Sequence, residues 1–66
     1  MTVTINGERR EIPEGLSVSA LLDYLGFTNK RVAVERNREI LPRAQWQQTQ
    51  VESGDIFEIV HFVGGG

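Results

Sequence analysis

The stretch Ile-Phe-Glu-Ile-Val-His-Phe-Val-Gly-Gly-Gly, residues 56–66, decides the fold of this chain. Its first part, residues 56–63, predicts a long final strand, in which successive side chains point to opposite faces. One face carries Phe57, Ile59, His61 and Val63, and the other carries Ile56, Glu58, Val60 and Phe62. Only one of these faces can pack against the rest of a small domain.

The position of Glu58 indicates which face is buried. A carboxylate is costly to bury without a partner, so we expect Glu58 and Val60 to point outward. Phe57 and Ile59 then face the core. Val60 and Phe62 become exposed apolar residues, and such a patch on a small domain more often marks an interface than an accident. The sequence therefore predicts a candidate partner surface formed by Val60, Phe62 and Glu58.

The glycines Gly64, Gly65 and Gly66 add nothing to a folded core, because glycine loses much backbone entropy on ordering and has no side chain to bury. We expect residues 1–63 to form the domain and residues 64–66 to form a flexible C-terminal tail. Three extended residues reach about 10 Å, far enough to enter a narrow site on another protein. The alternative is a linker or a frayed end.

The first half of the chain predicts a hairpin and a helix. Thr2–Ile5 alternates polar and apolar residues, and Asn6-Gly7 is a strong hairpin signal before a returning strand at Glu8–Ile12. Ser17 is expected to cap the start of the helix, and Gly26 is expected to end it. Residues at helical spacing form its apolar face: Val18, Leu21, Leu22 and Leu25.

The second half predicts two more strands before the final one. We expect a buried strand at Arg31–Glu35, a turn at Asn37–Glu39 and a short strand at Ile40-Leu41. A helical turn at residues 44–48 is expected to bring Trp46 against the body of the domain. One helix on one face of a mixed sheet is the α+β class. With the final strand in the middle of the sheet, the order of elements is that of the β-grasp, or ubiquitin-like, fold.

The composition excludes several kinds of site. The chain has no cysteine, which excludes disulfides and thiolate chemistry, and its one histidine, His61, cannot build a histidine metal cluster alone. A net charge of −2 argues against nucleic acid as a partner. The arginines alternate with acids in Glu8–Glu11 and Glu35–Glu39, which predicts solvated charges. No membrane-length apolar run or signal peptide is present, so we expect a cytoplasmic protein with no membrane partner.

No internal residue predicts an active site. Asp55 and Glu58 are close in sequence, but Asp55 is typical of a turn acid, and paired carboxylates need a cleft that so small a domain hardly offers. His61 lacks a nucleophile or an orienting partner, which favours an ordinary strand residue. Trp46 is expected to lie in the core. We therefore expect a protein that is not an enzyme and binds no cofactor or metal of its own.

The terminal carboxylate, on Gly66, is the remaining reactive group. A carboxylate is a poor electrophile, so its use requires activation, typically as an acyl-adenylate made from ATP. A sulfur nucleophile can then displace AMP. Glycine suits this position because no Cβ crowds the carbonyl, and Gly64 and Gly65 can thread a narrow channel in extended form.

Several stretches carry a recognisable pattern: Val32–Asn37, Ile40–Trp46, Gly54–Ile56 and Gly64–Gly66. With the hairpin and the helix, they resemble the ThiS family of thiamin-thiazole sulfur carriers over the whole chain. A Gly-Gly end is shared with ubiquitin and with the small subunit of molybdopterin synthase. The spacing of Pro42-Arg43 and Trp46 after Asn37 favours the thiazole branch.

The resemblance implies that other proteins act on this chain. A ubiquitin-activating-like adenylyltransferase would adenylate Gly66 with ATP and magnesium, which that partner uses. A sulfur donor such as a cysteine desulfurase would supply the sulfur of a thiocarboxylate, and thiazole synthase would take it. The alternatives are a carrier for molybdopterin synthesis, a ubiquitin-like modifier joined to lysines, and a β-grasp binding module with an accidental tail.

Overall fold

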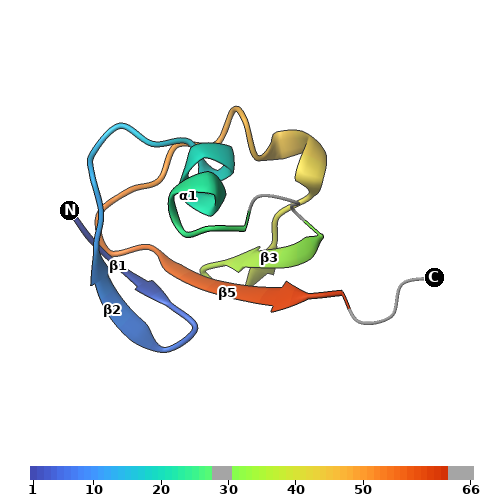
Figure 1. Ribbon diagram of the computed structural model, residues 1–66, viewed down its shortest axis with the longest axis horizontal. Coiled ribbons are helices and arrows are strands. Elements are labelled where there is room, and N and C mark those ends of the chain that lie inside the picture. The colour runs from blue at the N-terminus through green and yellow to red at the C-terminus, as the bar shows by residue number, and fades with distance from the viewer. Residues whose placement is uncertain (28–30, 63–66) are drawn as a thin grey trace.

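The computed structural model describes residues 1–27 and 31–62, which form a five-stranded mixed sheet with one α-helix on one face (Figure 1). The elements are β1 (Thr2–Ile5), β2 (Glu8–Glu11), α1 (Val18–Tyr24), β3 (Val32–Arg36), β4 (Glu39–Ile40), the 3-10 helix η1 (Arg43–Gln45) and β5 (Ile56–His61). The strands lie in the order β2-β1-β5-β3-β4. β5 is parallel to β1 and antiparallel to β3, so the final strand lies in the middle of the sheet as predicted. The predicted α+β class is confirmed.

The ends of several elements differ from the prediction. In the turn after β3, Asn37 has a φ of 51° and Arg38 a φ of 71°. This two-residue turn lets Arg36 pair directly with Glu39. The two flanking strands therefore run Val32–Arg36 and Glu39–Ile40, not Arg31–Glu35 and Ile40-Leu41. β2 ends one residue early, and a 3-10 helix at Arg43–Gln45 replaces the turn predicted at residues 44–48. β5 ends at His61, and Val63 lies outside the described residues.

Helix α1 has both predicted caps. The Ser17 hydroxyl accepts a hydrogen bond from the backbone N–H of Ala20 at 3.1 Å. At the other end Gly26 has a φ of 95°, and the Phe27 N–H donates to the Leu22 carbonyl at 2.8 Å, which is a Schellman ending. So short a helix is unstable alone, so its persistence depends on packing against the sheet.

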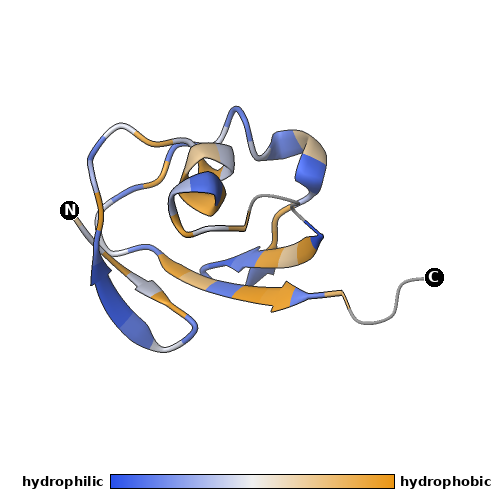
Figure 2. Ribbon diagram, in the orientation of Figure 1, coloured by the Kyte–Doolittle hydropathy of each residue, from blue (hydrophilic) through white to orange (hydrophobic). Residues whose placement is uncertain are grey.

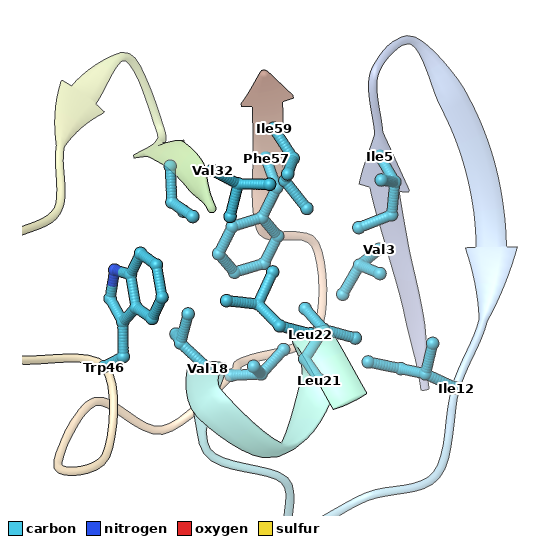
Figure 3. Packing of buried hydrophobic residues seen from close by; sticks show 12 residues of the cluster. Val3, Ile5, Ile12, Val18, Leu21, Leu22, Val32, Trp46, Phe57 and Ile59 are labelled. Carbon is cyan, nitrogen blue, oxygen red and sulfur yellow. The ribbon is translucent and has the colours of Figure 1, made fainter. Parts of the chain in front are cut away.

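The core lies between α1 and the inner face of the sheet (Figure 3). Phe57 and Ile59 of β5 point toward the buried face of the helix, with Trp46 on one side and Val3 of β1 on the other. Trp46 is 3% exposed, and its indole N–H donates to the Leu41 carbonyl at 3.0 Å. The predicted core position of Trp46 is confirmed.

Asp55, in the turn before β5, is the buried charged residue that ties two loops together. Its carboxylate accepts hydrogen bonds from the Glu52 backbone N–H at 2.9 Å, from Arg36 Nε at 3.0 Å and from Asn37 Nδ2 at 3.2 Å. The bond from Glu52 confirms Asp55 as a turn acid. The prediction that the arginines of Glu35–Glu39 are solvated is wrong for Arg36, because its partner is an acid 19 residues away in sequence.

We expect Asp55→Ala to lower the free energy of unfolding by about 2–3 kcal/mol, because it leaves partly buried donors on Arg36, Asn37 and Glu52 without their acceptor. Urea unfolding followed by circular dichroism measures the change. The matched control is Glu52→Gln, whose carboxylate is 75% exposed and 3.8 Å from Arg36. It is expected to cost less than about 0.5 kcal/mol. Equal urea midpoints for Asp55→Ala and the wild type would show that this carboxylate does not join the loops.

Candidate functional site

The central strand β5 has one buried and one exposed face. Phe57 is fully buried and Ile59 is 5% exposed, whereas Val60 and Phe62 are 60% and 62% exposed. Glu58 is also exposed. The face predicted from the cost of burying Glu58 is therefore confirmed, and the sheet presents Val60, Phe62 and Glu58 away from the helix.

The register of the sheet extends this surface onto the strands beside β5. Ala33 of β3 lies opposite Val60, and Glu35 lies opposite Glu58 on one side and opposite Ile40 of β4 on the other. Residues directly opposite one another in a sheet share a face. We call this surface the outer patch, and its members are Ala33, Glu35, Ile40, Ile56, Glu58, Val60 and Phe62.

The sequence prediction of this surface missed the residues at its sides. Ile40 is 67% exposed and Ile56 is 50% exposed, and both add apolar area to the patch. Alternation had placed Ile56 on the same face as Val60, but the predicted partner surface did not include it. Ile40 was less accessible to this reasoning, because the short strand β4 begins one residue earlier than predicted.

A groove of about 320 Å³ adjoins the outer patch. It lies beside β3, and its lining is mostly apolar, with Leu41, Trp46 and Phe62 among its walls. The Arg43 guanidinium lies over the Trp46 ring, 5.7 Å from the ring centroid, and closes one side. Phe62 therefore belongs both to this groove and to the outer patch, and it is the last residue that the structure describes before the glycines.

The side chains of two asparagines, one on each side of β5, bind the backbone of that strand. Asn6 Oδ1 accepts from the Ile59 N–H at 2.7 Å and Asn6 Nδ2 donates to the Ile59 carbonyl at 3.1 Å, which imitates a strand pairing. From the other side Asn37 Oδ1 accepts from the Ile56 N–H at 3.0 Å. Both asparagines lie in tight turns with a φ of 51°. The sequence predicts the turns, but it does not show that their side chains reach β5.

Of the other predicted residues, His61 lies within the described part of the chain and the glycines do not. His61 is exposed at the end of β5, and its ring centroid lies 5.1 Å from that of Phe27. In residues 1–27 and 31–62, no group of three or more potential metal ligands gathers. No helix in the same ranges is long and apolar enough to cross a membrane. The predicted tail residues Gly64, Gly65 and Gly66 lie outside the described residues, as does the predicted domain boundary at residue 63.

Comparisons with known proteins agree along the whole chain. The sequence model of the ThiS family matches residues 3–66. The chain is 30% identical to the sulfur carrier protein ThiS of Escherichia coli over the full length of both. It is also 48% identical to a thiazole synthase of Paramagnetospirillum magneticum, of whose length it spans about a fifth.

The fold agrees as well. The crystal structure of a thiamine biosynthesis protein (ThiS) from Geobacter metallireducens superposes with a TM-score of 0.86 and 38% identity over the full length of both chains. This confirms the β-grasp, ubiquitin-like fold predicted from the order of the elements. With its sequence match from residue 3 to residue 66 and this shared fold, the chain belongs to the ThiS family.

Proposed function

We propose that this protein carries sulfur for thiamin biosynthesis, as a substrate of other enzymes rather than as an enzyme. The observation that carries the proposal is the full-length match to a curated sulfur carrier protein ThiS, together with the shared fold. An exposed apolar patch close in sequence to the glycines supports it, because a carrier must be gripped while its end is modified. The alternatives that we weighed, molybdopterin synthesis and protein modification, have no comparable support.

The proposed reaction takes place at the carboxyl group of Gly66. That carboxylate attacks ATP in a ubiquitin-activating-like adenylyltransferase, forming an acyl-adenylate and releasing pyrophosphate. The terminal sulfur of a persulfide on a donor such as a cysteine desulfurase then displaces AMP to form an acyl disulfide, and a thiol reductant cleaves the S–S bond to leave the thiocarboxylate. Thiazole synthase takes this sulfur into the thiazole ring. The carrier holds no cofactor, since ATP and magnesium belong to the adenylyltransferase, and we place the reaction in the cytoplasm.

The structure of the carrier supports this division of labour. Asp55, which is the buried carboxylate among the described residues, is occupied by three hydrogen bonds. A glycine end has no side chains to clash with such a channel. The outer patch supplies recognition, and because successive partners use the same surface they compete for it.

The first prediction of this function concerns the modified atom. After incubation with ATP, the adenylyltransferase and a sulfur source, intact mass should rise by the replacement of one oxygen by sulfur. Tandem mass spectrometry should place the sulfur on Gly66, because the chain has no cysteine to hold it elsewhere. Sulfur on an internal residue would rule out the proposed mechanism.

The second prediction concerns the space around the tail. Gly65→Val should leave the thermal midpoint unchanged and lower the adenylation rate by at least tenfold, because the added side chain clashes within the partner's channel. Pyrophosphate release measures adenylation. Ala44→Val, which adds the same side chain at an exposed position of η1, is the control and should react at the wild-type rate. Normal adenylation of Gly65→Val would mean that no narrow channel exists.

The third prediction concerns the outer patch. Val60→Asp should cost at most about 1 kcal/mol of stability, because Val60 is 60% exposed, yet it should weaken binding to both the adenylyltransferase and thiazole synthase. Calorimetric titration with each enzyme measures the affinities. Gln47→Asp adds the same charge in an exposed turn and should bind as the wild type does. Wild-type affinity of Val60→Asp for both enzymes would remove the outer patch from the docking surface.

A further inference from the structure

Two acids face each other at the centre of the outer patch. Glu35 of β3 and Glu58 of β5 are directly opposite in the antiparallel ladder. The Phe62 N–H donates to the Arg31 carbonyl, so the alternation of the ladder makes Glu35 and Glu58 a hydrogen-bonded pair. The Cα atoms of such a pair are about 5.5 Å apart, and both side chains leave the same face of the sheet.

This pair is not neutralised within the part of the chain that the structure describes. No basic side chain forms an ion pair with Glu35 or Glu58 there, and the neighbouring Arg36 is turned to Asp55 and Glu52. Like charges directly opposite in a sheet are destabilising. The free domain therefore keeps an unfavourable contact in the middle of its docking surface.

The neighbours of the two acids along β5 and on β4 are apolar. Along β5, Glu58 lies between Ile56 and Val60, and across the sheet Ile40 lies opposite Glu35. In Figure 2 a hydrophilic band lies between hydrophobic stretches of the central strand. A side chain that fits here needs an apolar stem and a cationic head. Arginine meets both needs, because its planar guanidinium offers enough donors to bridge two carboxylates.

We propose that the outer patch docks thiazole synthase through an arginine of that enzyme, whose guanidinium bridges Glu35 and Glu58. The inference rests on the proposed function and names the chemistry by which one partner is recognised. Charge complementarity argues for the arginine, because two carboxylates in a largely apolar surface, with no basic partner in residues 1–27 and 31–62, attract a cation. Thiazole synthase is the partner because a thiazole synthase relative contains a stretch similar to this chain within its own length.

The acids should affect stability and affinity in opposite directions. Replacing either acid by glutamine keeps its size and removes only its charge. In the free domain this relieves repulsion, so the thermal midpoint should stay equal or rise. In the complex it removes one arm of the bridge, so affinity for the synthase should fall by about 10-fold or more. A residue that merely supports the fold would lower both quantities together.

The experiment titrates the full chain with purified thiazole synthase at low and high salt. The variants are Glu35→Gln, Glu58→Gln, the double variant and the control Glu14→Gln, an exposed acid in the loop before α1. Each patch variant should bind more weakly than the wild type, and the double variant should lose most of the salt dependence, since screening then has less charge to act on. Glu14→Gln should bind within about twofold of the wild type.

Two results separate this inference from the function on which it rests. If the double variant binds the synthase as tightly as the wild type, with the same salt dependence, the bridging arginine is wrong. The mass assay for sulfur on wild-type Gly66 is run in parallel. A wild-type chain that never acquires sulfur overturns the proposed function. If the wild type acquires sulfur but the double variant binds the synthase as the wild type does, only the bridging arginine is overturned.

Discussion

The rest of the structure depends on the central strand β5, which fills the core with one face and forms the docking surface with the other. Its inner side chains fill the core under α1, and its outer side chains form the outer patch. A strand with both duties must not slip, because a shift of one residue would exchange the two faces. β1 and β3 pair with it on its two sides, and Asn6 and Asn37 bind its backbone directly. These contacts fix which residues a partner meets.

The same requirement explains the partly buried ion pair between Arg36 and Asp55 beside so small a core. Below about 70–80 residues, a hydrophobic core alone supplies little stability, and this chain has no cysteine for a disulfide. Asp55 joins the turn before β5 to the turn after β3 through Arg36 and Asn37. Such a pair adds little net stability, but removing one partner is strongly destabilising. The pair therefore favours this register over registers that would separate the two residues. The network therefore holds the start of β5 in register.

The sequence was sufficient for features that depend on neighbouring residues. Alternation along residues 56–62 and the cost of burying Glu58 predicted the faces of β5 correctly, and Ser17 and Gly26 marked the ends of the helix. Contacts between distant residues were not predictable in this way. That Arg36 binds Asp55, or that Glu35 faces Glu58, depends on the register between β3 and β5, two strands that β4 and η1 separate in sequence. The two-residue turn after β3 was not predicted, because it places Arg38 at a positive φ, where glycine is usual.

The two acids of the outer patch bear on what a carrier surface has to achieve. An exposed apolar sheet face invites association between copies, and a charge placed on it prevents this. Either acid alone would serve that purpose, so solubility does not account for two acids placed directly opposite each other. An unfavourable pair persists when something outside the fold benefits from it, because natural domains need only remain above a stability threshold. A partner that supplies the missing cation gains affinity from the repulsion that it relieves. The same charges keep the free carrier from associating with its own copies.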